Sequence, residues 1–215
     1  MTGVYPLINR CRPALLLLLV PLASLAEPRC EADALPDPSA DYRARVEAIN
    51  TGLGISDTSI KNRGLSLQIQ QDDLVVADID PGQGVFFMSR EARDAWREMQ
   101  AAAMVDDVTL TLVSAFRSLE HQEQLLRDRL KNGETIETVL KTSTPPGFSE
   151  HHTGDALDFM TTDVEPFTEA FAETRAFRWL EENAADYCFK LSYPEEDNNG
   201  IKFEPWHWRL LRAGE

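Results

Sequence analysis

The order of the hydrophobic segments constrains the fold of this 215-residue chain more than any other feature. Segments that alternate or cluster β-formers (64–70, 74–80 and 108–113) and segments with helical spacing come in separated runs, without a regular strand–helix–strand repeat. Separated runs are typical of α+β domains rather than of parallel sheets. We therefore predict an α+β fold, a small antiparallel sheet flanked by helices.

The other elements follow from periodicity and capping residues. Ser89 and Ser118 stand at the N-cap positions of two helices, and the pair Asn132-Gly133 ends the second helix. Helices are predicted over 41–50, 90–104, 119–131, 134–142 and 168–186, and further strands over 155–159, 187–193 and 201–210.

The N-terminal residues have the pattern of a secretory signal peptide. Arg10 and Arg12 precede the apolar run PALLLLLVPLASLA, which ends in small side chains. This run is shorter than the roughly twenty residues that cross a bilayer, so cleavage after Ala26 is favoured over a membrane anchor. We expect a signal peptide (1–26), a proline-containing linker (27–40), and a single domain (41–215) that is exported to the periplasm or the extracellular space.

The net charge excludes one class of function. The formal net charge of −15 argues against sequence-independent binding to nucleic acid, because phosphate binding needs clustered Lys and Arg.

Once the signal peptide is removed, Cys30 and Cys188 remain as a pair in an oxidising compartment. We predict a disulfide between them, with two unpaired thiols as the alternative.

The stretch SEHHTGDALDF (149–159) contains two of the four histidines of the chain side by side, followed by two aspartates three residues apart. Imidazole nitrogens and carboxylates are zinc ligands, and the glycine between them lets the backbone turn. The ligands are His151 or His152, and Asp155 or Asp158. On a strand the two aspartates project from opposite faces, so the residues by themselves leave the choice open.

A second motif, FEPWHWR (203–209), contains Glu204 and His207. A catalytic zinc typically has three protein ligands and an open position, with a nearby glutamate that takes a proton. Residues three apart face opposite ways on an ideal strand, but Pro205 favours a bulge or an edge that brings both to one side. Trp208 is interpreted as a core aromatic.

Arg117 follows the strand predicted at 108–113, in the motif SAFRS. Its planar fork suits a substrate carboxylate, or the oxyanion that forms when water attacks an amide. A surface salt bridge is the simpler interpretation of one arginine taken alone.

The motifs above, taken in their order along the chain, resemble those of a known enzyme family. SAFRSxxxQ, PPGFSEHHTGDALD, WLEENAADYCFKLSYP and GIKFEPWHWR together resemble the zinc D-alanyl-D-alanine carboxypeptidases of the VanY-like family, over about 108–209. The resemblance implies the fold of the hedgehog and D-Ala-D-Ala peptidases, a Zn²⁺ cofactor and peptidoglycan stem peptides as substrate. One departure is Ser192, where many relatives carry an arginine.

Carried over to this sequence, the resemblance assigns three roles. The implied zinc ligands are His151, Asp158 and His207, and the implied catalytic residues are Glu204 as general base and Arg117. The residues implied to contact substrate are Arg117, Gln122 and Ser149. His152 and Asp155 are then framing residues, and His121 is expected to be solvated.

The implied reaction is removal of a C-terminal D-alanine, that is, a D,D-carboxypeptidase. An L,D-carboxypeptidase and a cell-wall endopeptidase remain alternatives within the enzyme class. A non-catalytic peptidoglycan-binding module is the alternative outside it. A structural zinc site is normally closed by four protein ligands, and three ligands with a free glutamate favour catalysis.

Overall fold

The computed structural model describes residues 30, 32–82, 84–196 and 200–213, so the predicted signal peptide lies outside the described residues. A four-stranded antiparallel sheet has the order β3-β4-β6-β5. Its strands are β3 (Thr111–Ser114), β4 (Ala156–Met160), β5 (Phe189–Leu191) and β6 (His207–Leu210). A separate hairpin pairs β1 (Val75–Asp80) with β2 (Gly84–Met88).

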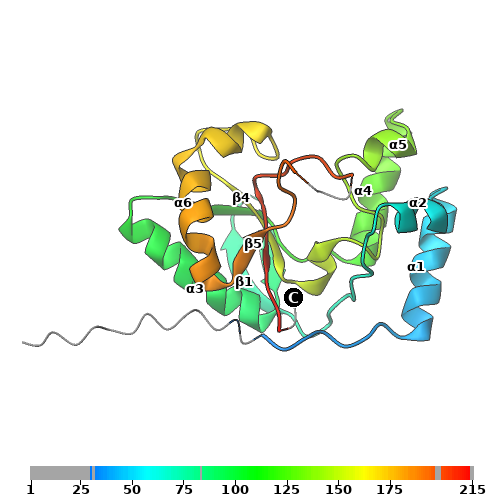
Figure 1. Cartoon of the computed structure of the whole chain (residues 1–215), viewed down its shortest axis with the longest axis horizontal. Helices are drawn as coiled ribbons and strands as arrows, with labels where there is room; N and C mark the ends of the chain where they lie inside the picture. The colour runs from blue at the N-terminus through cyan, green and yellow to red at the C-terminus, as the bar shows by residue number, and fades with distance from the viewer. Residues whose placement is uncertain (1–29, 31, 83, 197–199, 214–215) are drawn as a thin grey trace, which may run out of the picture.

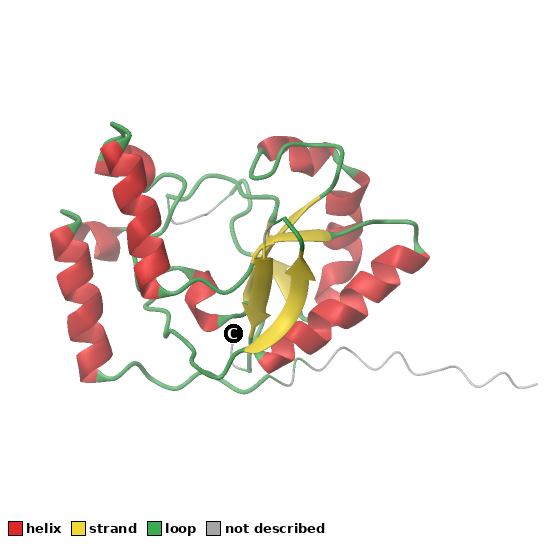
Figure 2. Ribbon diagram, turned by 180° about the vertical axis from the view of Figure 1, so that it is seen from behind, coloured by secondary structure: helices red, strands yellow, loops and turns green. Residues whose placement is uncertain are grey.

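Helices lie on both sides of these strands (Figures 1 and 2). The α-helices are α1 (Ala40–Gly52), α2 (Asp57–Asn62), α3 (Arg90–Val105), α4 (Leu119–Lys131), α5 (Ile136–Val139) and α6 (Arg175–Asn183). Three 3-10 helices are η1 (Glu150–Thr153), η2 (Glu169–Glu173) and η3 (Ala184–Tyr187). Helices α3 and α6 lie at one end of the molecule, and α1, α2, α4 and α5 lie at the other. The predicted α+β fold with a small antiparallel sheet is confirmed.

Local sequence signals explain several of these elements. The hydroxyls of Ser89 and Ser118 accept hydrogen bonds from the backbone N–H groups three residues on, which confirms both predicted N-caps. The apolar face of α3 packs Trp96 against Phe159 of β4, with ring centroids 5.0 Å apart. Trp208 is buried in the same core, as predicted.

Two predicted elements are shorter in the structure, since 134–142 contains only α5 (Ile136–Val139) and 187–193 only β5 (Phe189–Leu191), and three others differ more. Residues 64–70 form no strand, since they lie along the loop before η1 with isolated bonds such as that from Gln68 N–H to the Gly147 carbonyl. The helix predicted over 168–186 is divided, because Thr174 is extended. Thr174 ends η2 and is the N-cap of α6. The last strand begins only at His207, after a turn through Pro205.

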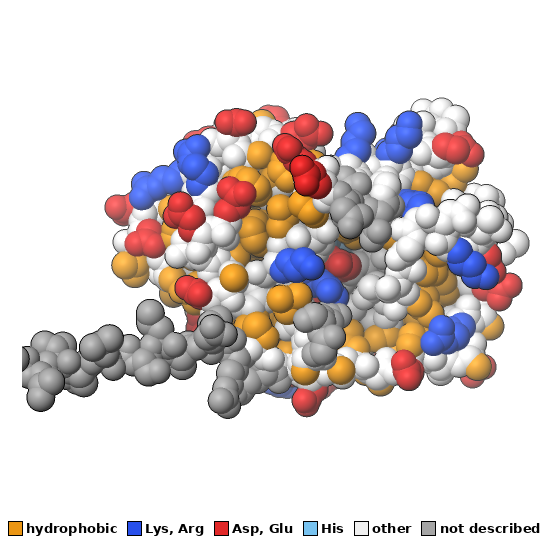
Figure 3. Space-filling view, in the orientation of Figure 1, with side chains coloured by type: hydrophobic (Ala, Val, Ile, Leu, Met, Phe, Trp, Pro, Cys, Tyr) orange, Lys and Arg blue, Asp and Glu red, His pale blue; other side chains and the backbone are white. Residues whose placement is uncertain are grey.

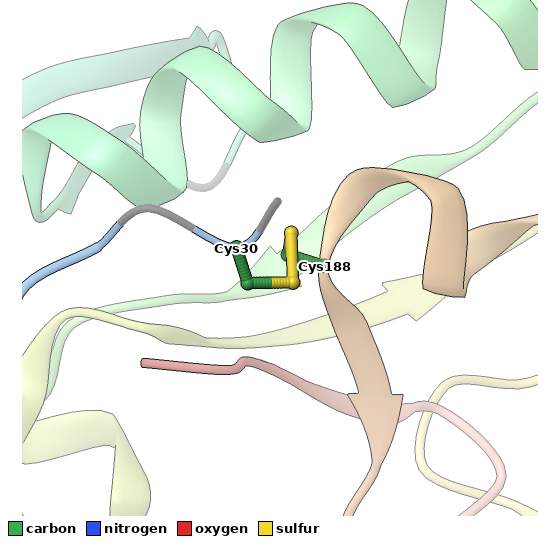
Figure 4. Close-up of a disulfide and its surroundings, with 2 residues drawn as sticks. All are labelled: Cys30 and Cys188. Carbon is green, nitrogen blue, oxygen red and sulfur yellow. A yellow bond between two sulfur atoms is a disulfide. The ribbon is translucent and has the colours of Figure 1, made fainter. Parts of the chain in front are cut away.

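The segment that precedes α1 runs along the domain and is tied to its C-terminal end. The predicted disulfide between Cys30 and Cys188 is confirmed, and Figure 4 shows Cys188 at the turn into β5. Ala32 is buried and its carbonyl accepts the Ala213 N–H at 2.8 Å. Among the described residues, no helix is long and apolar enough to cross a bilayer.

Candidate metal-binding and active site

Three side chains from distant parts of the sequence meet at one end of the four-stranded sheet. His151 comes from η1, and Asp158 of β4 lies directly opposite His207 of β6 in the register. Each offers a ligand atom, and these atoms all lie within 4.8 Å of one another. We call His151, Asp158 and His207 the ligand group. All three side chains are almost fully buried. The predicted convergence of the three residues is confirmed as geometry.

Gly154 makes this convergence possible. It caps η1 with a φ of 75°, in the left-handed region that favours glycine, and so turns the chain from η1 into β4. A Cβ atom at this position would lie 2.7 Å from the backbone nitrogen of Ser89 and 2.8 Å from Cδ2 of Leu74. The turn therefore needs glycine for its conformation and for its space.

The hydrogen bonds of the two imidazoles direct one nitrogen of each toward Asp158. Nδ1 of His151 lies 2.6 Å from the Ala115 carbonyl, which leaves Nε2 at 3.2 Å from Oδ2 of Asp158. Nε2 of His207 lies 2.8 Å from Oε2 of Glu150, which leaves Nδ1 at 3.0 Å from Oδ1 of Asp158. Two imidazole nitrogens and one carboxylate are the donor set of a catalytic zinc site, so these residues fit that ion.

Neighbouring charges shift the pKa values of Glu150, Asp158 and His207. Burial opposes ionisation of Glu150, but the hydrogen bond from His207 and the nearby positive charges lower its pKa to about 2. Burial also opposes ionisation of Asp158, yet the two imidazoles hold its pKa well below the usual range. Burial disfavours the charged form of His207, but its bonds to Asp158 and Glu150 raise its pKa to about 10. The carboxylates of Glu150 and Asp158 therefore lie on either side of the His207 ring, one at each nitrogen.

His152 and Asp155, which we predict to be framing residues, bond to groups other than His151, Asp158 and His207. The His152 ring is fully buried, accepts the Gly147 N–H on Nε2 at 3.0 Å, and contacts the Arg117 carbonyl through Nδ1 at 2.5 Å. Asp155 points away from the ligands and binds Arg212 through both oxygens, at 2.6 and 2.8 Å. These two residues join η1 and β4 to the neighbouring loops and to the C-terminal segment.

Arg117 lies beside the ligand group rather than on the surface. Its Nη2 donates to Ser114 at 3.0 Å and lies 3.9 Å from Oδ2 of Asp158. Its Nη1 donates to the amide oxygen of Gln122 at 2.9 Å, and the Gln122 amide nitrogen donates to the Thr144 carbonyl. Gln122 is therefore buried and engaged at both ends, which suits it to orient Arg117.

His151, Asp158 and His207 are among the residues that line a cleft of about 800 Å³. Ser149, Arg117 and Gln122 line it, and so does His121, which is exposed as predicted. In the face drawn in Figure 3, Lys and Arg side chains are interspersed with Asp and Glu. The aromatic side chains that line the cleft are Phe167, Tyr193, Phe203 and Trp206.

Glu204 lines the same cleft and is not one of the three ligand residues. A turn closed by the bond from the His207 N–H to the Glu204 carbonyl, at 3.0 Å, brings the two side chains to one side. The predicted distortion at Pro205 is therefore present, as a turn instead of a bulge. Burial raises the pKa of Glu204 to about 7, so its carboxyl group exchanges a proton near neutral pH.

Sequence reasoning missed Glu150 and Tyr193. Glu150 directly precedes His151, and its carboxylate reaches His207 and Arg209 on β6. Tyr193 packs its ring 4.8 Å from the His207 ring, and burial raises its pKa well above the usual value. The only available signal for Glu150 was its position next to a candidate ligand.

Taken together, the fold and the donor set define a class, a small α+β domain with a group of residues that could hold one divalent metal in a cleft lined by a protonatable glutamate. The chain belongs to the VanY family, D-alanyl-D-alanine carboxypeptidase, whose family model matches residues 86–213. That match covers the sheet, the ligand group and the residues around it.

Curated relatives agree with this membership. The chain is 31% identical over 174 residues to the putative carboxypeptidase YodJ of Bacillus subtilis (strain 168), covering 77% of this chain and 63% of the relative. It is 29% identical over 179 residues to a D-alanyl-D-alanine carboxypeptidase of Enterococcus faecium, covering 79% of this chain and 52% of that protein. The chain thus spans less than two thirds of the length of these relatives.

Solved structures share the fold. The LD-carboxypeptidase LdcB superimposes with a TM-score of 0.59 at 28% identity, covering 68% of this chain and 72% of LdcB. VanYB in complex with D-alanine-D-alanine gives a TM-score of 0.54 at 23% identity, covering 67% of this chain and 81% of VanYB. A VanY variant in complex with Zn(II) gives 0.50 at 21% identity, covering 67% of this chain and 86% of the variant.

Proposed function

We propose that this chain is an exported zinc peptidase that removes the C-terminal D-alanine from peptidoglycan stem peptides. The observation that carries the proposal is the convergence of His151, Asp158 and His207 in a cleft that also contains Glu204 and Arg117. The family membership and the name of the 29% identical Enterococcus faecium relative support the same activity. The VanY variant with bound Zn(II) supports zinc as the metal.

In this proposal the protein residues have separate tasks. His151, Asp158 and His207 would hold the zinc ion, which supplies Lewis acidity and a water of lowered pKa. Glu204 takes the proton of the attacking water and later returns it to the departing amine. Arg117, held by Gln122 and Ser114, donates hydrogen bonds to the negative charge that develops on the carbonyl oxygen.

Removal of Glu204 tests this assignment. The Glu204→Ala variant should retain zinc, because Glu204 is outside the ligand group, and should release D-alanine at least about a hundredfold more slowly. Glu169→Ala is the matched control, since Glu169 is an exposed carboxylate on the same cleft. Undiminished release by a zinc-loaded Glu204→Ala variant would remove Glu204 from the mechanism.

An L,D-carboxypeptidase is the second candidate, because LdcB is a structural neighbour at 28% identity. The two activities differ in the peptide they shorten. Mass spectrometry of the products from a defined pentapeptide and a defined tetrapeptide distinguishes them, since a D,D-carboxypeptidase shortens only the pentapeptide. Cleavage inside a cross-linked dimer would instead indicate an endopeptidase.

Export is the remaining part of the proposal. The basic and apolar N-terminal pattern supports a signal peptide, and the disulfide between Cys30 and Cys188 supports an oxidising compartment. The test is the N-terminus of the mature protein recovered from the periplasm or the medium, which should begin at Glu27. A chain that retains residues 1–26 and stays in the cytoplasm would contradict export.

A further inference from the structure

The side chain of Glu150 connects the stretch 149–159 to the motif 203–209. Glu150 is the first residue of η1, and its side chain is 15% exposed beside the buried ligand group. Oε2 accepts from Nε2 of His207 at 2.8 Å, and Oε1 lies 3.3 Å from Nε of Arg209. Residues 207 and 209 share one face of β6, so a single carboxylate can contact both of them.

This contact determines which nitrogen of His207 is available to a metal. An imidazole that binds through Nδ1 keeps its proton on Nε2, and an acceptor at Nε2 fixes that tautomer and the ring orientation. The acceptor for the other ligand, His151, is the backbone carbonyl of Ala115, at 2.6 Å. The two imidazoles therefore differ, because only His207 depends on a side chain for its acceptor.

The carboxylate is itself held in place. Ser192 also makes a side-chain hydrogen bond to Glu150, so contacts from β6 and from the segment after β5 restrain it. In this chain the positive partner is Arg209, which lies on the same strand as the ligand it helps to place.

We propose that Glu150 is a positioning residue of the metal site, whose carboxylate, held by Arg209 and Ser192, fixes His207 with Nδ1 directed at Asp158 and His151. The proposal rests on His207 being a metal ligand, as in the function proposed above. Glu150 is not among the residues that line the cleft, and in this proposal it acts through His207.

Zinc affinity is the first measurement, made on the purified chain by competition with a chromophoric chelator. Replacing the partner of a metal-bound histidine typically weakens metal binding about 10–100-fold, and we expect this loss for Glu150→Ala. Glu150→Gln should lose less, because its amide oxygen still accepts from Nε2 but carries no charge. The matched control is Glu134→Ala, which removes a carboxylate held by Arg129 that contacts none of the ligands.

A double variant distinguishes positioning from a general structural role. If Glu150 acts only through His207, then Glu150→Ala should weaken zinc binding no further in a His207→Ala background. An equal loss in both backgrounds would overturn the proposal.

Proton NMR of the zinc-loaded protein supplies an independent signature. The Nε2–H resonance of His207 should shift or be lost by exchange in Glu150→Ala, whereas the Nδ1–H resonance of His151, bonded to Ala115, should stay in place. Unchanged zinc affinity with an unchanged His207 resonance would refute the role of Glu150. Loss of both resonances with a lowered Tm would show a general structural role and refute it as well. If the unaltered chain binds no zinc, the proposed function fails together with this inference, whereas failure of the variants alone leaves the proposed function standing.

Discussion

Reduction of the bond between Cys30 and Cys188 should destabilise the chain by an amount that follows from its position. The two cysteines are separated by 158 residues, so the oxidised unfolded chain is one large closed loop. The chain-entropy relation for such a loop gives about 17 cal/mol/K, or about 5 kcal/mol at 25 °C. In a domain of this size each kcal/mol moves Tm by about 2–4 °C, so the expected decrease is about 10–20 °C.

The native contacts of the N-terminal segment indicate that this loss arises mainly in the unfolded state. Arg212 donates to the Asp33 carbonyl and Ala32 is buried, and neither of these contacts involves the sulfur atoms. Urea unfolding should therefore show a larger m-value for the reduced chain, because its unfolded state exposes more surface. The assay compares oxidised protein, reduced protein and the Cys30→Ser/Cys188→Ser double variant, and the last two should agree. A decrease in Tm below about 3 °C, with the bond verified by mass spectrometry, would refute the loop-entropy argument.

Three substitutions test the packing around the site, each by urea denaturation. Gly154→Ala should lower the free energy of unfolding by about 2–4 kcal/mol, because the φ of this residue is 75° and the new Cβ would lie 2.7 Å from the backbone nitrogen at the N-cap of α3. A loss below about 1 kcal/mol would contradict the assigned strain. Arg212→Met should cost about 3–5 kcal/mol because it leaves the Asp155 carboxylate buried without its cation, and adding Asp155→Asn should recover part of that loss. Phe167 is 51% exposed with a φ of 60°, so Phe167→Gly should leave stability unchanged or raise it by up to about 1 kcal/mol. A clear loss at Phe167→Gly would show that its ring contact with Trp206 outweighs the backbone strain.

Local sequence signals predicted helices and strands best where a residue's contribution depends only on its neighbours in the chain. Ser89 and Ser118 were recognised as N-caps because a hydroxyl in that position satisfies a free backbone N–H, whatever the rest of the chain does. The helical spacing of 90–104 predicted α3 because its apolar face has to be buried.

Local signals failed where partners from elsewhere decide the structure. Residues 64–70 have strand-like alternation but pair with no strand in the part of the chain that the structure describes, and a single backbone bond joins Gln68 to Gly147. The segment 168–186 reads as one helix, but the extended conformation of Thr174 divides it. An alternating pattern describes a possible strand, and only a partner makes it one.

For the site, the sequence by itself determined the chemistry available: two adjacent histidines, two aspartates in one short stretch, and a Glu-Pro-Trp-His motif near the C-terminal end. The residues alone left His151 and His152, and Asp155 and Asp158, as equal alternatives, and the family resemblance was needed to choose between them.

Only the tertiary structure decided the orientation of each side chain. Neighbouring residues on a strand or a 3-10 helix point in different directions, and long-range pairing selects the direction that faces the cleft. Pairing of β4 with β6 sets Asp158 opposite His207, while Arg212 draws Asp155 to the other side. Likewise, the nitrogen that each ligand presents depends on Ala115 and Glu150, residues 36 and 57 positions away from the histidines they contact.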